Sequence, residues 1–369
     1  MHNNSPLVSI VANFYNSERY IPRLIESVIN QTYDNWELIC VNDSSLQNDA
    51  LIISQHIKSP KSKGRIKLIN NERNLGICKS KQVGINNANG TYITFIDGDD
   101  WFAPKAIESM LEPAMKFNLD LVIMNNYKII PLINKKWLMF SDVSEYNKPI
   151  YTPELFDKYF INFFGKNIFA TNSYWGKLYK RELFSKISNW PNNDTYEDNI
   201  VNFRLFPFVK SIMFIEYPGY YYRWGGITSG KSNTIYKHSR VIDIINEYYI
   251  ERLNSIYKYN YQKATHLLNC ELKNVLKVAI SQIAKYKPNS VKANNLVTEI
   301  ENILSHDAYN HFSEYINSGE KQIDDEIVRY IANRDAKSVY LYCHSLYNKN
   351  RMKRLIKRTL HKLSSILLK

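Results

Sequence analysis

The stretch TYITFIDGDDW, residues 91–101, joins an apolar run to a cluster of three carboxylates. The apolar run predicts a buried strand, and Asp97, Asp99 and Asp100 follow directly after its end. Like charges repel, so this cluster indicates a bound cation, and carboxylate oxygens are the ligands that Mg²⁺ or Mn²⁺ prefers. The alternative is an acidic turn in which Asp97 or Asp100 caps a helix that begins near Pro104.

Short apolar runs and helical patterns alternate around this stretch. The other candidate strands are LVSIVA at 7–12, WELICV at 36–41, RIKLIN at 65–70 and LDLVIM at 119–124. Helices are expected over 21–29, 76–88 and 104–116. This order predicts an α/β fold with a mostly parallel sheet that helices cover on both faces. Ligands bind beyond the carboxyl ends of such strands, where Asp43 and the aspartates of residues 97–100 fall.

The composition is that of a globular protein with an excess of positive charge. The chain has 369 residues, of which 44% are hydrophobic, and its 48 Lys and Arg residues outnumber 35 Asp and Glu residues for a net charge of +13. Such a balance permits nucleic acid, membrane lipid or a phosphorylated substrate as an anionic partner. Much of the excess is local, because residues 349–369 contain eight Lys and Arg residues and no acidic residue.

The sequence also carries signals about compartment. We find no run of about 18 apolar residues and no secretory signal, so we expect a cytoplasmic protein without a membrane-spanning helix. The four cysteines are far apart and show no CxxC spacing, which argues against a zinc site or a disulfide framework. We therefore expect reduced cysteines that serve packing.

Four segments, taken in order, resemble the signature of family 2 glycosyltransferases. They are VSIVANFYNSERYIPRLIESVINQTYDNWELICVNDSS at 8–45, NERNLGICKSKQVGI at 71–85, TFIDGDDW at 94–101 and YEDNIVNF at 196–203. Members of this family are inverting enzymes with the nucleotide-binding GT-A fold. The resemblance covers roughly residues 6–230 and implies a nucleotide-sugar donor, most often one linked to UDP.

The resemblance implies a set of residues that bind the nucleotide. Tyr15 is similar to the aromatic residue near the uracil ring, Glu18 to the nearby acidic position, and Asp43 to the aspartate that accepts the uracil N3 hydrogen. Packing in the core for Tyr15, and a helix cap within NDSS for Asp43, are the alternatives. Lys81 stands where the family usually has Arg; it keeps the charge but lacks the fork geometry for a phosphate contact.

The resemblance also implies a metal site and contacts to the diphosphate. Asp97 and Asp99 match the DxD motif, with Asp99 as the direct ligand of Mg²⁺ or Mn²⁺ and Asp97 facing ribose or metal. A divalent cation would neutralise the charge that develops on the leaving nucleotide diphosphate. Arg223 and Ser229 look like the residues that contact the diphosphate in related bacterial members.

The acceptor side is implied by two further features. Glu197 and Asp198 resemble the ED motif, whose aspartate acts as general base on the acceptor hydroxyl, so Asp198 is the expected base and Glu197 the next candidate. An acidic first turn of a helix is the alternative for Glu197. Trp175 is expected to line the acceptor cleft, although packing would also explain it.

We expect three parts along the chain. Residues 1–235 would form the GT-A domain, with a donor-binding half over 1–125 and an acceptor and catalytic half over 126–235. A helical C-terminal domain would follow over 236–348. Apolar and basic residues alternate at helical spacing near the end, so 349–369 is expected to be an amphipathic helix on an anionic bilayer. A terminal helix docked on its own domain is the alternative.

Taken together, these patterns predict a metal-dependent inverting glycosyltransferase. It would move a hexosyl or N-acetylhexosaminyl group from a UDP-sugar to a hydroxyl of a bacterial surface glycan, such as capsule or lipopolysaccharide, at the inner face of the cell membrane. A nucleotidyltransferase would explain the aspartate cluster but not the ED motif. A non-enzymatic protein that binds anions or nucleic acid is the other alternative, but we expect no nucleic-acid partner because no base-reading motif is evident.

Overall fold

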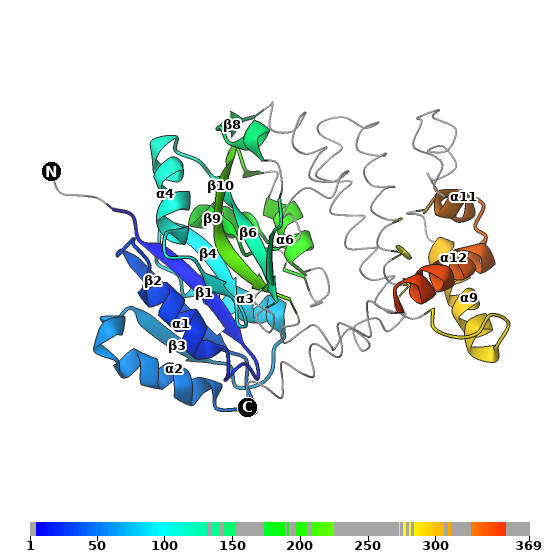
Figure 1. Ribbon diagram of the computed structural model, residues 1–369, viewed down its shortest axis with the longest axis horizontal. Coiled ribbons are helices and arrows are strands. Elements are labelled where there is room, and N and C mark those ends of the chain that lie inside the picture. Colours follow the sequence, from blue (N-terminus) through cyan, green and yellow to red (C-terminus); the bar gives the residue numbers. More distant parts are fainter. Residues whose placement is uncertain are drawn as a thin grey trace. The chain divides into compact units, whose positions relative to one another are not determined.

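The computed structural model describes residues 5–130, 135–140, 143–152, 173–188, 190–191, 197–205, 208–224, 273, 276–277, 280–281, 284–305, 309–310 and 326–351. The chain divides into two compact units, one formed chiefly by Met1–Tyr159 and Ile168–Ile227 and the other chiefly by Thr228–Leu367. The elements of the first unit are coloured blue to green in Figure 1, and those of the second are coloured yellow to red.

A ten-stranded sheet runs through the described residues of the first unit (Figure 1). Its strands are β1 Val8–Phe14, β2 Trp36–Asn42, β3 Ile66–Asn70, β4 Tyr92–Asp97, β5 Trp101–Phe102, β6 Leu121–Ile130, β7 Lys135–Leu138, β8 Ile150–Tyr151, β9 Lys177–Lys180 and β10 Ser211–Arg223. The order is β3-β2-β1-β4-β9-β6-β10-β5, with β7 beside β6 and β8 beside β10. Strands β1 to β4 are parallel, whereas β9 is antiparallel to both β4 and β6.

Helices cover both faces of the parallel part of the sheet. The helices described in this unit are α1 Ile21–Ile29, α2 Asp49–Lys58, α3 Ile77–Asn86, α4 Ala106–Lys116 and α6 Glu197–Leu205, with 3₁₀ turns η1 Pro60–Ser62, η3 Ser144–Tyr146 and η5 Arg181–Lys186. Alternate residues of β1, among them Val8 and Ile10, join the same core cluster as Leu24 of α1. The intervening Val11 faces α3, where a Cβ on Gly84 would lie 2.3 Å from its Cγ1. Gly84 thus lets α3 approach the sheet closely, and the predicted α/β class with a mostly parallel sheet is confirmed.

The described residues of the second unit are helical. They form α9 Val291–Leu304, α11 Glu326–Ala332 and α12 Ala336–Lys349. Ser290 and Asp335 cap two of these helices, because their side chains accept hydrogen bonds from the backbone N–H groups of Ala293 and Ser338. The predicted amphipathic helix lies mostly at 352–369, outside the described residues. Within the described part of the chain, every helix is too short or too polar to cross a bilayer.

Candidate functional site

The carboxyl ends of the central parallel strands bring two predicted residues, Asp43 and Asp97, to one edge of the sheet. The register pairs Asn13 of β1 with Asp97 of β4 and Phe14 of β1 with Asn42 of β2. Asp43 follows Asn42 directly, and its N–H donates to the Phe14 carbonyl at 2.8 Å. The end of β1 therefore lies between Asp43 and Asp97, as the nucleotide-binding prediction requires.

Asp43 is buried and holds the loop that leads into α3. Its Oδ1 accepts hydrogen bonds from the Leu75 N–H and the Asn71 amide, both at 2.8 Å, and its Oδ2 accepts from the Gly76 N–H at 3.0 Å. Gly76 is the N-cap residue of α3. Asp43 thus holds the loop just before α3 rather than capping a helix within its own NDSS segment, and these three donors fix its carboxylate at the strand edge.

Tyr15 and Glu18 lie on the loop that follows β1. Tyr15 is 36% exposed, so the alternative of a core residue is wrong. The Glu18 Oε2 accepts hydrogen bonds from both the backbone and the side-chain nitrogen of Asn48, the N-cap residue of α2, each at 3.2 Å. Glu18 therefore ties the loop after β1 to α2 beside the expected nucleotide.

Asp100 is the buried member of the aspartate cluster. It accepts hydrogen bonds from the Tyr220 hydroxyl and from the Arg223 N–H, both at 2.7 Å, and the Asp97 N–H donates to the same hydroxyl at 3.1 Å. Burial raises the pKa of Asp100 well above its usual range, and the nearby charges of Asp99 and Asp97 raise it further. Asp100 thus fastens the turn between β4 and β5 to strand β10.

Asp97 and Asp99 remain partly exposed at the same turn. Among the described residues, no group of three or more His, Cys, Asp or Glu side chains converges on one point. Mg²⁺ is commonly held by one or two carboxylates together with substrate phosphates, so two partly exposed aspartates beside a nucleotide site fit such an ion. The chemistry of this donor set therefore agrees with the expected metal.

Arg223 ends β10 against the back of this turn. Its Nε donates to the Asp99 carbonyl at 2.7 Å, and its guanidinium lies 4.8 Å from the Tyr20 ring and 4.9 Å from the Trp101 ring. These contacts leave the side chain of Arg223 only slightly exposed and brace the turn that carries the aspartates. Ser229, the other residue expected at the diphosphate, lies outside the described residues.

Lys81 joins the two acidic motifs, a role that the sequence did not reveal. Its Nζ lies 3.7 Å from Asp97 Oδ1 and 3.5 Å from Glu197 Oε1, and 4.4 Å from the centre of the Tyr174 ring. Burial alone would lower the pKa of Lys81, but the carboxylates of Asp97, Glu197 and Asp198 raise it above its usual value. Lys81 therefore carries its charge between the motifs, and a contact to phosphate remains a prediction.

Glu197 and Asp198 begin α6 but differ in exposure. Glu197 is 7% exposed, and burial, with the neighbouring Asp198 charge, raises its pKa to about 8 although Lys81 opposes the rise. Asp198 is half-buried, so it is the less enclosed of the two candidates for the base.

A buried polar network that sequence reasoning missed anchors this helix. Lys177 of β9 donates from Nζ to the carbonyl and hydroxyl oxygens of Ser173, and the Asn202 amide of α6 donates to the same carbonyl at 3.0 Å. The Tyr179 hydroxyl donates to the Asn202 Oδ1 at 2.8 Å. Burial lowers the pKa of Lys177 to about 7, although the Asp198 charge raises it. The network ties α6 to β9.

Trp175 packs on the aromatic side chains of β10. Its ring stacks on Tyr220 at 4.7 Å and on Tyr222 at 5.3 Å between centroids, with interplanar angles of 14° and 16°. Because the Tyr220 hydroxyl binds Asp100, Trp175 lies next to the support of the aspartate turn. Trp175 is half-buried, so packing on Tyr220 and Tyr222 accounts for its buried part. Contact of its exposed part with an acceptor stays a prediction.

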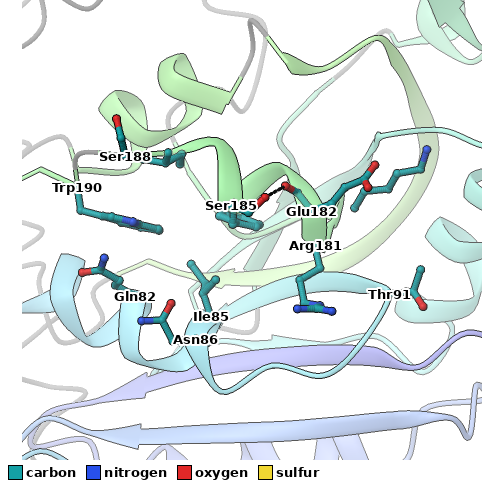
Figure 2. A pocket seen from close by; sticks show the side chains of 12 residues that line it. Gln82, Ile85, Asn86, Thr91, Arg181, Glu182, Ser185, Ser188 and Trp190 are labelled. Carbon is teal, nitrogen blue, oxygen red and sulfur yellow. Dashed lines mark hydrogen bonds between the residues drawn. The ribbon is translucent and has the colours of Figure 1, made fainter.

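A separate cavity of about 790 Å³ lies between α3 and η5. Figure 2 shows Trp190 and Gln82 at one end of this cavity and Arg181 and Thr91 at the other. The Arg181 N–H donates to the Thr91 carbonyl, directly before β4 begins, whereas Asp97 ends that strand. The cavity is therefore at the amino end of β4 and none of the predicted site residues lines it.

Comparisons with known proteins agree with this geometry. The model of Glycosyl transferase family 2 matches residues 9–188. The glycosyltransferase GlyA of Streptococcus pneumoniae is 25% identical over 291 residues, which cover 77% of this chain and 40% of GlyA. The UDP-Glc:alpha-D-GlcNAc-diphosphoundecaprenol beta-1,3-glucosyltransferase WfgD of Escherichia coli is 35% identical over 124 residues, 34% of this chain and 47% of WfgD. The chain thus spans less than half the length of either relative.

Solved structures show a related fold. Residues 1–349 of TarS from S. aureus, in complex with UDP, superpose with a TM-score of 0.63 at 15% sequence identity, covering 93% of this chain and 91% of that chain. The likeness concerns the fold alone, and it confirms the expected GT-A type of sheet followed by helices. Through residues 9–188, which include Tyr15, Asp43, Asp97 and Asp99, the chain belongs to glycosyltransferase family 2.

Proposed function

We propose that the chain is a metal-dependent inverting glycosyltransferase that moves a sugar from a UDP-sugar to a hydroxyl of a bacterial surface glycan. The observation that carries this proposal is the position of Lys81, whose Nζ lies 3.7 Å from Asp97 and 3.5 Å from Glu197. Lys81 thus contacts two carboxylates. One belongs to Asp97, which is expected to face the donor and the metal, and the other to Glu197, which is next to the expected base Asp198. The UDP complex of TarS and the UDP-Glc donor in the name of WfgD support the choice of donor.

The donor would lie along the edge formed by the ends of β1, β2 and β4. Tyr15 would pack on the uracil ring, and Asp43, with a lone pair left on its Oδ2, would accept the N3 hydrogen. Asp99, with Asp97, would hold Mg²⁺ or Mn²⁺, which when bound supplies positive charge to the leaving diphosphate. Arg223 would add a cation on the same side.

Asp198 would act on the acceptor. As general base it would take the proton of the attacking hydroxyl while the new bond forms at the anomeric carbon and the bond from that carbon to the diphosphate breaks. A single displacement of this kind inverts the configuration. Glu197, held by Lys81 and raised in pKa by burial, would keep α6 in position instead of reacting.

The acceptor and the location complete the proposal. Trp175 would pack against an acceptor sugar, since aromatic rings present an apolar surface to the C–H face of a sugar. Residues 349–369, with their cations and apolar residues, would lie on the inner face of the cell membrane, where a lipid-linked acceptor is confined.

A screen of nucleotide sugars tests the activity. Purified protein should release UDP from one UDP-sugar in the presence of Mg²⁺ or Mn²⁺, and a chelator should stop the release. Release of pyrophosphate with incorporation of a nucleotide would instead identify a nucleotidyltransferase.

The variant Asp99→Asn tests the metal site by calorimetry with UDP. Because an amide carries no charge to hold the ion, UDP affinity should no longer rise when metal is added. Asp34→Asn, at a side chain 82% exposed and paired with Arg65, is the control and should behave as wild type. Metal-enhanced UDP binding by Asp99→Asn would refute the assignment.

A further inference from the structure

The outer strands of the sheet carry a continuous set of aromatic and cationic side chains on one face. The register places Lys128 of β6 opposite both Trp137 of β7 and Tyr222 of β10. Residues directly opposite each other on neighbouring strands project to the same side of a sheet, so these three side chains share a face.

Ring and cation contacts extend this set in both directions. Trp175 stacks on Tyr222 at 5.3 Å, the Lys128 Nζ lies 5.3 Å from the Trp224 ring, and the Lys135 Nζ lies 5.2 Å from the Trp137 ring. We name this set the aromatic face; its members are Trp175, Tyr222, Trp224, Lys128, Lys135 and Trp137. Trp137 is 41% exposed, which is high for a side chain of its size.

The aromatic face begins beside the aspartate turn. Arg223, which follows Tyr222 in β10, donates from its Nε to the Asp99 carbonyl at 2.7 Å. The neighbouring Tyr220, on the same face as Tyr222, binds Asp100 through its hydroxyl. From there the face extends across β6 to β7, so its far end is two strands away from the turn.

The chemistry of the face indicates its ligand. Indole and phenol rings offer flat apolar surfaces on which the C–H face of a sugar can pack, and ammonium groups bind carboxylate or phosphate. Residues 121–140 contain no Asp or Glu, so no acidic side chain from β6 or β7 offsets Lys128 and Lys135. We propose that the aromatic face binds the acceptor as an extended anionic glycan, whose sugars carry carboxylate or phosphate groups; the proposal rests on the transferase activity proposed above.

The opposite side of β7 provides a matched control. Lys136 and Leu138 alternate with Lys135 and Trp137 along the strand and therefore project to the other face. Leu138 is 44% exposed, and the Lys136 Nζ lies 4.6 Å from the Tyr127 ring. One strand thus carries an exposed apolar residue and a lysine on each side. The side of Leu138 also leads back to the aspartate turn, because Tyr127 stacks on Tyr221 and Tyr221 on Trp101, but β6 and β7 place only Lys136 there, against Lys128 and Lys135 on the aromatic face.

Titration of the full chain with two oligosaccharides tests the proposal without any catalytic step. The probes are a hyaluronan hexasaccharide, which carries carboxylates, and neutral chitohexaose, each used up to about 10 mM. Wild type should bind the anionic hexasaccharide more tightly than the neutral one. Trp137→Ala and Lys128→Ala should each weaken this binding about tenfold, whereas Leu138→Ala and Lys136→Ala should not.

Three outcomes would overturn the proposal: no binding of the anionic hexasaccharide by wild type, equal binding of both probes, or equal losses on both faces of β7. The last result would indicate a surface that contacts a membrane or another polyanion through the whole strand. The thermal midpoint of each variant shows whether a loss reflects unfolding. UDP release by wild type is measured separately, so a failed donor screen counts against the transferase activity and a failed titration counts against the aromatic face.

Discussion

The two acidic motifs of the first unit are built alike but are held by different chemistry. At the turn after β4, Asp100 is buried while Asp97 and Asp99 are partly exposed; at the start of α6, Glu197 is buried while Asp198 is half-buried. In each motif one carboxylate is buried against partners from other elements, and the other acidic side chains are more exposed.

The partners of the two buried carboxylates differ. Asp100 accepts hydrogen bonds from neutral groups, the Tyr220 hydroxyl and the Arg223 N–H, whereas Glu197 pairs with the ammonium of Lys81. A neutral partner can be removed at the cost of one hydrogen bond, but removal of a buried ionic partner leaves an uncompensated charge. The start of α6 should therefore respond more strongly to mutation than the turn after β4.

The largest effect is expected at the accessible carboxylate of α6. Asp198→Asn removes the proposed base, so transfer should slow by about 10²- to 10⁴-fold. UDP binding, measured by calorimetry, should stay close to wild type, because the expected donor contacts lie on other elements. Turnover within a few-fold of wild type would place the base elsewhere, with Glu197 the next candidate.

Loss of the ionic partner should cost the most stability. Lys81→Met leaves Asp97 and Glu197 without their shared cation, and we expect the free energy of unfolding to fall by about 3 kcal/mol in a urea titration at about pH 9, where Glu197, with a pKa of about 8, is charged. The double variant Lys81→Met with Glu197→Gln should recover part of this loss, because it removes the unpaired carboxylate as well. If Lys81→Met unfolds at the wild-type urea concentration, the bridge is not a stabilising contact.

The pH dependence of stability tests the raised pKa of Glu197 at the start of α6. The pKa of Glu197 is raised from 4.5 to about 8 in the folded state, so its protonation stabilises the fold fully below about pH 4.5, and this contribution is lost as the pH rises through about 8. Compared with Glu197→Gln, wild type should therefore lose a few kcal/mol of stability between about pH 5 and 8. Parallel unfolding curves for the two proteins across this range would argue against the raised pKa.

The smallest effect is expected at the neutral partner of Asp100. Tyr220→Phe removes the hydrogen bonds that the hydroxyl makes to Asp100 and accepts from the Asp97 N–H, but it keeps the ring that stacks on Trp175, so the free energy of unfolding should fall by about 2 kcal/mol. A loss as large as that of Lys81→Met would show that the turn depends on this hydroxyl as strongly as α6 depends on its ion pair.

Local patterns predicted much of the first unit. The helix expected over 21–29 is α1 Ile21–Ile29, and the strand expected before the aspartates is β4 Tyr92–Asp97. The sequence did not predict β9 Lys177–Lys180, an antiparallel strand that inserts between β4 and β6. Four residues are too few to show a regular alternation of apolar and polar side chains. This strand is specified instead by its pairing with β4 and β6.

The sequence by itself determined the elements of the parallel sheet and the residues expected to carry the chemistry, because apolar periodicity and motif residues are local properties that can be read along the chain. The tertiary structure alone decided how they combine. Asp43, at the end of β2, binds the loop before α3, Lys81 joins Asp97 to Glu197, and Asp100 accepts hydrogen bonds from β10. Each of these contacts depends on distances between segments far apart in the chain, and such distances exist only once the sheet has brought the strand ends together.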